Sequence, residues 1–474
     1  MSYVSGPNGL GTIELKNSPL GDGSDFGDNR PFGVNGGPTA LAVGDLNGDT
    51  FPDLAVTVPD TLDPTGQNGF IHLLINDGGS GQNWNGFRSS IQIPVGRNPV
   101  DLVLTDLDND PAHRLDIAVV NRSSGSVTIF RNDGTDGNQD PILANATTLT
   151  GFSDPRGIAA GNLDRNFPSN PSERRYRSDI AVTNFASGTI TTFSNTSTAG
   201  NLLFSSGSNL SVGNGPRRIV LADIDNDKDL PTTVRQQSIL VLRPSESTLS
   251  VLHRNQDSEG FVQTDYLVGT DPVDIVVGHL RNVALPSDIA VVNQGSDSIS
   301  ILVNRSGGEF SPPANLSVGS APSAIVATNV DGDDDLDLAF CSGAPGFREV
   351  QLLRNDISGP QLAFVLLNGQ VTSGTSPKFI AAANVDNDSQ QGDDLVTIDG
   401  TGARAFDNIK VIRNRLTDII CPPDFNHDAS VDFFDYLDFV DAFSADDPSA
   451  DFNGDTSIDF FDYLDFVDAF SIGC

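Results

Sequence analysis

The chain is poor in the residue types that carry most enzyme chemistry and most nucleic-acid contacts. Its 474 residues include five His, three Cys, one Met and one Trp, and the 27 Lys and Arg are outnumbered by 63 Asp and Glu, for a formal net charge of −36. Phosphate contacts need Lys and Arg, so this balance argues against a nucleic-acid partner. No apolar run reaches the length of about 18 residues that spans a bilayer, so membrane insertion is not expected.

Familiar catalytic motifs are missing as well. The sequence contains no Gly-x-Ser-x-Gly, no His-Glu-x-x-His and no phosphate loop, and its five His are scattered over unlike positions. We therefore predict that the protein is not an enzyme. Two alternatives stay open: a lectin-like glycan-binding module, which the single Trp and five Tyr do little to support, and an extracellular hydrolase that uses paired carboxylates.

Glutamate is scarce too, although the chain is acidic. Only six Glu occur, so nearly all of the acidic side chains are Asp. Solubility alone would not choose between the two acids. The short Asp side chain suits tight loops that fold oxygen atoms around a hard cation. The excess of Asp therefore predicts several Ca²⁺ sites.

An acidic signature recurs seven times along the chain. An apolar segment is followed by Asp/Asn-x-Asp/Asn-x-Asp, then by a further Asp and a second apolar segment. The copies begin at Asp45, Asp106, Asn162, Asp223, His279, Asn329 and Asn384, with spacings of 61, 56, 61, 56, 50 and 55 residues. A repeat of this length built from short strands is typical of a β-propeller, in which each blade contacts only its neighbours.

Each repeat follows one plan. A Pro begins the first strand, the acidic loop leads to the second strand, and two more strands complete a blade; the Pro residues stand at 38, 99, 155, 216, 272, 322 and 377. We predict an all-β, seven-bladed propeller over residues 38–420, with residues 1–37 as lead-in. The seventh repeat lacks a fourth strand. We expect the N-terminal strand Thr12–Leu15 to supply it and close the ring, the alternative being a disordered tail.

The copies of the acidic loop differ in quality. The first and sixth are complete, the second and seventh carry their last Asp two residues late, the third is doubtful, and the fourth has Ser238 in the last acidic place. The fifth reads His279-Leu-Arg281 and is predicted to have lost its ion. The predicted ligands in the propeller are Asp45, Asn47, Asp49, Asp53, Asp106, Asp108, Asp110, Asp116, Asp223, Asp225, Asp227, Asn329, Asp331, Asp333, Asp337, Asn384, Asp386, Asp388 and Asp394.

The C-terminal segment, 421–474, contains a duplication. Residues 432–444 and 459–471 are identical, and each copy completes a twelve-residue loop followed by apolar residues at helical spacing. We predict a small α-helical domain with tandem EF-hand-like loops. Its predicted ligands are Asp424, Asn426, Asp428, Ser430, Asp432 and Asp435 in the first copy, and Asp451, Asn453, Asp455, Ser457, Asp459 and Asp462 in the second.

The cysteines divide into two groups. Cys421 and Cys474 bracket the C-terminal segment, so a disulfide between them is favoured over two free thiols in an oxidising compartment. Cys341 ends an apolar strand and is predicted to be a small buried hydrophobic side chain.

The repeats resemble FG-GAP or VCBS repeats, the blades of the integrin-α propeller, and the C-terminal segment resembles a type I dockerin of the form common in planctomycete surface proteins. The first resemblance implies Ca²⁺ held in the acidic loops on one rim. The second implies docking to a protein partner or to a neighbouring copy, with a packed calcium-stabilised cap as the alternative. Together they predict an extracellular or cell-surface structural or adhesive protein, a filament or surface-layer component among the candidates, with a cell-surface glycan as a further candidate ligand.

Overall fold

The computed structural model divides the chain into two compact units, residues 1–414 and 415–474. The described residues are 3–4, 13–18, 26–32, 34, 37–59, 69–79, 84–88, 91–164, 177–198, 200–205, 207–224, 236–254, 260–281, 287–305, 307–319, 321–330, 335–342, 349–355, 362–367, 371–372, 377–387, 393–399, 409–414, 433–445, 450, 452 and 458–472. No helix among them is both long and apolar enough to cross a membrane.

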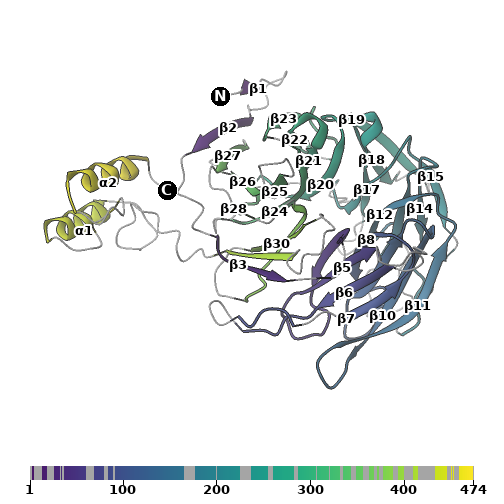
Figure 1. The fold of residues 1–474 in the computed structure, drawn as a ribbon. Coiled ribbons are helices and arrows are strands. Elements are labelled where there is room, and N and C mark those ends of the chain that lie inside the picture. The colour runs from purple at the N-terminus through teal and green to yellow at the C-terminus, as the bar shows by residue number, and fades with distance from the viewer. Residues whose placement is uncertain are drawn as a thin grey trace. The chain divides into compact units, whose positions relative to one another are not determined.

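The first unit is an all-β propeller of seven blades arranged around an axis (Figure 1). The first strands of the blades contact one another in sequence, and the last contacts the first, so they form a closed inner ring. These strands are β4 (Ala40–Gly44), β8 (Pro99–Thr105), β12 (Pro155–Gly161), β16 (Ile219–Ala222), β20 (Pro272–Gly278), β24 (Pro322–Thr328) and β29 (Pro377–Ala383). The recurring Pro thus lies at or just before the strand start, where no ladder hydrogen bond is lost.

The second strands form the buried centre of each blade. They are β5 (Asp53–Pro59), β9 (Asp116–Asn121), β13 (Asp179–Asn184), β17 (Ser238–Arg243), β21 (Asp288–Asn293), β25 (Asp337–Ser342) and β30 (Asp394–Asp399). Five of them, β9, β13, β17, β21 and β25, are buried at every position. Their central residues are almost all apolar because neighbouring blades cover both faces, and polar residues occupy the strand ends. Cys341, at 0% exposure, is one of these core side chains, as predicted.

Two outer strands complete each blade, with antiparallel pairing throughout. The third strands are β6 (Gly69–Leu74), β10 (Ser126–Thr135), β14 (Thr189–Phe193), β18 (Thr248–Arg254), β22 (Ser298–Leu302), β26 (Glu349–Asn355) and β31 (Ile409–Asn414). The fourth are β7 (Ile91–Val95), β11 (Pro141–Thr150), β15 (Ser208–Ser211), β19 (Phe261–Leu267), β23 (Ala314–Ser317), β27 (Ala363–Leu367) and β3 (Phe26–Phe32).

The N-terminal segment closes the seventh blade, but not with the strand that the sequence predicted. β3 (Phe26–Phe32) pairs antiparallel with β31, whereas β2 (Ile13–Ser18), which contains most of the predicted strand Thr12–Leu15, pairs parallel with β27 of the sixth blade. Two short strands, β1 (Tyr3–Val4) and β28 (Val371–Thr372), extend that sixth sheet. Phe32 fastens β3 by packing edge-on against Trp84 and Phe87 of the first blade, at 5.9 and 5.1 Å between ring centroids.

A recurring Asn at or just after the end of the third strand joins a blade to the preceding one, and among the described residues five blades have this bond. Its side-chain amide donates to a backbone carbonyl in the acidic loop of that blade: Asn132 to Leu46 at 2.7 Å, Asn195 to Leu107 at 2.8 Å and Asn304 to Ile224 at 2.7 Å. Asn76 makes the same bond to Val385, at 2.7 Å, and so joins the first blade to the seventh. Ring closure therefore rests on noncovalent bonds between the two ends of the propeller.

The second unit contains two helices, α1 (Phe433–Ser444) and α2 (Phe460–Ile472), one from each copy of the duplicated sequence. They pack through equivalent residues: the rings of Phe439 and Phe466 stack with centroids 3.9 Å apart, and the hydroxyls of Tyr436 and Tyr463 lie 3.0 Å apart. Identical residues that meet in pairs indicate a local twofold relation between the helices. The predicted helices are thus present.

Candidate metal centre and channel pocket

The Asp that begins the second strand holds the acidic loop together in most blades. In the first blade, Asp53 accepts hydrogen bonds from the backbone N–H groups of Leu46 in the loop and Asn76 at the third-strand end, both at 2.8 Å. Asp116, Asp179 and Asp337 make the same pair of contacts in their blades. These carboxylates therefore brace the blade in addition to any role as metal ligands.

Burial leaves several of these carboxylates with raised pKa values. Burial raises the pKa of Asp53 and of Asp116 to about 7, and that of Asp179 to about 6, against the opposing effect of their backbone hydrogen bonds. Neighbouring Asp side chains add to the increase. A cation in the loop would remove this penalty, because it favours the ionised form.

The second blade brings three carboxylates together. Oxygen atoms of Asp106, Asp108 and Asp116 all lie within 4.8 Å of one another, which among the residues described here is the one group of acidic, His or Cys side chains close enough to share an ion. Asp110, the fourth predicted ligand, is paired with the guanidinium of Arg114 instead. His113 Nδ1 lies 2.8 Å from Asp106 Oδ2, and the Arg114 guanidinium balances part of the negative charge of the loop.

The first blade, whose loop matched the sequence pattern best, is arranged differently. Asp45 accepts hydrogen bonds from the backbone N–H groups of Gly48 and Thr50, at 2.6 and 2.8 Å, and Asp49 accepts one from Phe51 at 2.9 Å. The Asn47 amide donates to Asp49 at 2.8 Å. Asp45, Asp49 and Asp53 do not all lie within 4.8 Å of one another, in contrast to the three carboxylates of the second blade.

The remaining propeller loops are described only in part. Asp223 of the fourth loop, Asn329 and Asp337 of the sixth, and Asn384, Asp386 and Asp394 of the seventh are described, and Asp337 and Asp394 are buried. The other predicted ligands, Asp225, Asp227, Asp331, Asp333 and Asp388, lie outside the described residues.

In the fifth blade an arginine occupies the loop position at which the other blades have Asp or Asn. Arg281 forms a two-point ion pair with the buried Asp288, with Nε and Nη2 at 2.9 and 2.8 Å from the two carboxylate oxygens, and Nη2 also donates to the carbonyl of Asn304 at 2.8 Å. Alignment on Leu107 and Leu280 places Arg281 at the position of Asp108. The guanidinium thus supplies the positive charge for this loop.

Most predicted ligands of the C-terminal loops, Asp424 to Asp432 and Asp451 to Ser457, lie outside the described residues, as do Cys421 and Cys474. Asp435 and Asp462, the last ligand of each predicted loop, are buried at the start of α1 and α2. The backbone N–H of Asp459 donates to Asp462 at 2.8 Å.

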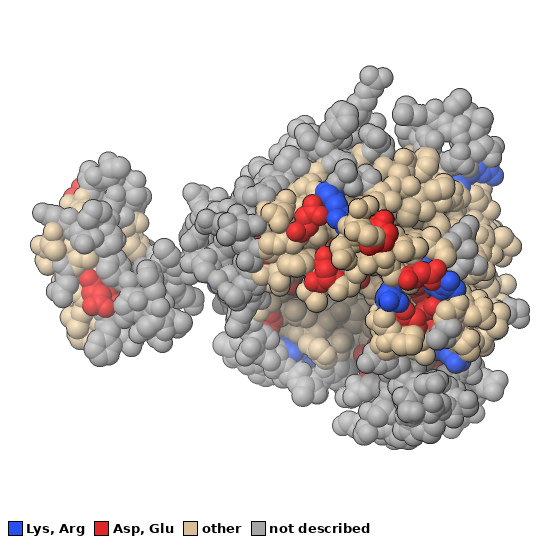
Figure 2. All heavy atoms as spheres, turned by 90° about the horizontal axis from the view of Figure 1, so that it is seen from below, with Lys and Arg blue, Asp and Glu red and all other residues tan. Residues whose placement is uncertain are grey.

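On the face of the propeller drawn in Figure 2, acidic side chains gather in separate clusters, with basic side chains next to some of them.

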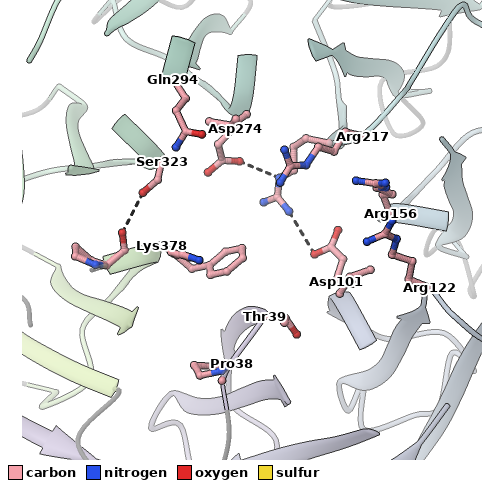
Figure 3. Close-up of a pocket in the computed structure, with 16 residues that line it drawn as sticks. Pro38, Thr39, Asp101, Arg122, Arg156, Arg217, Asp274, Gln294, Ser323 and Lys378 are labelled. Atoms are coloured by element: carbon pink, nitrogen blue, oxygen red, sulfur yellow. Dashed lines mark hydrogen bonds and ion pairs between the residues drawn. The ribbon is translucent and has the colours of Figure 1, made fainter. Parts of the chain in front are cut away.

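The largest surprise is a pocket of about 490 Å³ at the start of the inner strands (Figure 3). It is lined by residues at the recurring Pro or just after it, together with residues of the adjacent turns. Its charged lining residues are Asp101, Arg122, Arg156, Arg217, Arg218, Asp274 and Lys378. Sequence reasoning missed this pocket, although aligning the repeats on Pro would have revealed charged residues at two positions of otherwise apolar strands.

Arg218 spans the pocket between two blades. Its Nη1 lies 3.3 Å from Asp101 of the second blade, and its Nε lies 2.9 Å from Asp274 of the fifth. The charge of Asp274, ahead of the smaller effect of Asp101, raises the pKa of Arg218. Asp101 and Asp274 also accept hydrogen bonds, each at 3.0 Å, from the backbone N–H groups of Ile158 and Ile325 in the following blades. This ion triad therefore fastens the inner ring.

The comparisons with known proteins support the propeller. A sequence model of one family, the FG-GAP repeat, matches residues 37–74, the first blade up to the end of β6. The search of curated proteins found no match. The FG-GAP match in the first blade and the seven-bladed fold agree with the resemblance of the repeats to FG-GAP repeats, while the dockerin-like resemblance of the C-terminal unit has no such match.

Solved structures with a similar fold include three distant examples. BBS1N in complex with ARL6DN is 15% identical, with 82% of this chain and 96% of that one covered and a TM-score of 0.48. A protein from Lactobacillus plantarum is 14% identical (71% and 86%, TM-score 0.46), and a putative 6-phosphogluconolactonase from Bacteroides uniformis is 13% identical (72% and 86%, TM-score 0.49). At this distance they give no guidance on function.

Proposed function

We propose that the protein is a non-enzymatic, calcium-stabilised propeller that serves as a structural or binding protein outside the cell and docks through its C-terminal unit. The FG-GAP match in the first blade favours an extracellular structural or binding role. The observation that carries the calcium part is the contrast between two loops: three carboxylates converge in the second blade, and a guanidinium replaces the acid in the fifth. A loop that loses its acids and gains a fixed cation is expected where the other loops bind a mobile one.

The docking part is supported by exposed apolar side chains on the two helices. Phe433 and Leu437 of α1 are 65% and 41% exposed, and their copies in α2, Phe460 and Leu464, are 63% and 44% exposed. Aromatic and aliphatic side chains left in water at equivalent places on both helices favour a protein contact. The partner is either a foreign protein or a neighbouring copy of this chain.

The absence of enzyme activity is proposed from the state of the channel carboxylates. Asp101 and Asp274 are tied to Arg218 and to backbone N–H groups, and the described lining contains no His, Cys or Glu. A carboxylate fixed in this way is poorly placed to move a proton. A hydrolase screen with glycosides and esters tests this part, and turnover that Asp101→Asn abolishes would overturn it.

The first experiment combines thermal unfolding with negative-stain electron microscopy, each in Ca²⁺ and in chelator. We expect Ca²⁺ to raise the unfolding temperature, since a ligand that binds only the folded state stabilises it. Ca²⁺-dependent fibres or rings would identify the neighbouring copy as the docking partner, and dispersed discs would identify a foreign one. Equal unfolding temperatures in both conditions would refute calcium stabilisation.

A double variant tests the docking surface directly. Phe433→Ser with Phe460→Ser should abolish assembly in Ca²⁺, or capture of the foreign partner, while the propeller keeps its unfolding temperature. The matched control is Leu203→Ser with Leu267→Ser, which removes two exposed Leu side chains, 54% and 75% exposed, from the propeller. Docking that survives the first pair, or fails equally in both, would exclude the helices as the docking surface.

A further inference from the structure

Positive charge is concentrated at one side of the channel pocket in an otherwise acidic protein. Arg122, Arg156 and Arg217 come from three successive blades, and Figure 3 shows them on the same side of the pocket. Arg122 follows β9, Arg156 lies in β12 and Arg217 precedes β16. The chain has only 27 basic residues and a net charge of −36, so three neighbouring guanidiniums are an unusual local concentration of positive charge.

Two of these guanidiniums are held in place. Asp154 accepts a hydrogen bond from Arg122 Nε at 2.5 Å and from Arg156 Nη2 at 2.8 Å. Arg156 also lies over the ring of Phe185, 3.8 Å from its centroid. Although burial opposes it, these hydrogen bonds keep the pKa of Asp154 below its usual range, so this carboxylate stays ionised and the two side chains are preorganised.

Arg217 lies beside this pair with its side chain exposed in the pocket, and no ion pair joins it to any residue that the structure describes. Partial loss of hydration in the pocket, together with the positive charges of Arg156 and Arg122, lowers the pKa of Arg217. The negative charges of Asp271 and Asp274 act in the opposite direction. A guanidinium close to two others, with no carboxylate of its own, is the arrangement that a bound anion would stabilise.

The charges around the pocket leave room for one negative charge. Arg218 lies between Asp101 and Asp274, and Asp154 and Asp271 face the other three arginines. Together with Lys378, the five basic side chains exceed these four carboxylates by one. A monoanion therefore neutralises the site, whereas a phosphate dianion would leave it negative.

The rest of the lining suits a hydroxylated ligand. Gln294 offers an amide group, and Val100, Val273 and Phe379 offer apolar surface. The hydroxyls of Thr39 and Ser323 donate to the carbonyls of Pro99 and Pro377, so they are left to accept hydrogen bonds from a ligand. A volume of about 490 Å³ lies within the range of roughly 300–1,000 Å³ that small-molecule sites occupy. We propose that this pocket binds a small hydroxylated carboxylic acid, such as a uronic acid, with its carboxylate against Arg217 and its neighbouring arginines.

The test is isothermal titration of the full chain, in Ca²⁺, with glucuronate, glucose and glucose 6-phosphate. We expect one saturable site for glucuronate and at least tenfold weaker binding of glucose, which lacks the carboxylate. Because the protein as a whole repels anions, scattered adsorption should be small. Equal affinity for glucose, preference for the phosphate, or no saturable binding of glucuronate would each overturn the proposal.

Two variants locate the site. Arg217→Gln should weaken glucuronate binding by about tenfold or more, the usual effect of losing one charge-assisted hydrogen bond. Arg305→Gln is the control, because Arg305 is exposed and lies outside the pocket lining. Both should keep the unfolding temperature and its response to Ca²⁺, which separates this proposal from calcium stabilisation. If Arg217→Gln binds glucuronate as well as Arg305→Gln does, the pocket is not the site.

Discussion

The second and fifth blades differ in the charged side chains that surround the buried Asp at the start of the second strand. Both bury an Asp at the start of the second strand, Asp116 and Asp288, each 1% exposed. In the fifth blade Arg281 pairs with that carboxylate at two points, whereas in the second blade two more acids, Asp106 and Asp108, surround it. The fifth blade thus carries the balancing positive charge on Arg281, whereas in our calcium proposal a bound cation would supply it in the second blade.

The largest effect is expected when the ion pair of the fifth blade is broken. Arg281→Met leaves Asp288 buried without its partner and should cost about 3–5 kcal/mol of unfolding free energy, as is usual when one member of a buried ion pair is removed. Urea unfolding measures the loss, and Ca²⁺ should not restore it, because His279 and Val283 occupy positions at which the other loops carry Asp or Asn. Adding Asp288→Asn should recover part of the loss. A loss below about 1 kcal/mol would show that the pair is dispensable.

The second prediction concerns a variant in which the arginine of the fifth-blade loop is introduced at the equivalent position of the second blade. Asp108→Arg places a guanidinium at the position equivalent to Arg281, so the variant should be more stable than the wild type in chelator and should gain less from Ca²⁺. Asp108→Asn, the control, should lose the Ca²⁺ effect of this loop without the gain in chelator. With Ca²⁺ at about a hundred times its dissociation constant, one site contributes about 2.7 kcal/mol. An unchanged Ca²⁺ response in both variants would exclude this loop as a site.

The third prediction concerns pH and is the smallest. In chelator, the raised pKa of Asp116, about 7, means that the folded state holds more protons than the unfolded state between about pH 4 and 7. Stability should therefore fall as pH rises through that window, and Asp116→Asn should reduce the slope. Ca²⁺ should oppose the fall, since it binds the ionised form. A flat profile in chelator would contradict the raised pKa.

Some of the fold was predictable because it depends on local sequence patterns. The number of blades, the Pro at the start of each inner strand, the loss of acids in the fifth loop and the two C-terminal helices follow from repeats and periodicity, and the structure shows each of them. The closing strand was not predictable in the same way. β3 has the sequence Phe-Gly-Asp-Asn-Arg-Pro-Phe, which lacks an apolar run, and it is fixed by Phe32 against Trp84 and Phe87 of another blade.

The acidic loops, too, were predictable in position but not in geometry. Spacing identified the acidic loops, but it could not show in which of them the carboxylates lie close together. Asp106, Asp108 and Asp116 converge in the second blade. Asp106 and Asp108 accept hydrogen bonds from nearby backbone N–H groups, as Asp45 and Asp49 do in the first blade, so the geometry of the turn decides whether the three oxygens meet.

The sequence by itself determined the repeat, the strand order within each blade and the residues that brace the acidic loops, because these depend on neighbours within a few tens of residues. Only the tertiary structure decided which strand closes the ring and which charges meet at the axis. Arg122, Arg156 and Arg217 are separated by 34 and 61 residues. They form one cluster because the closed ring places the strand starts of successive blades side by side, next to the turn that carries Arg122.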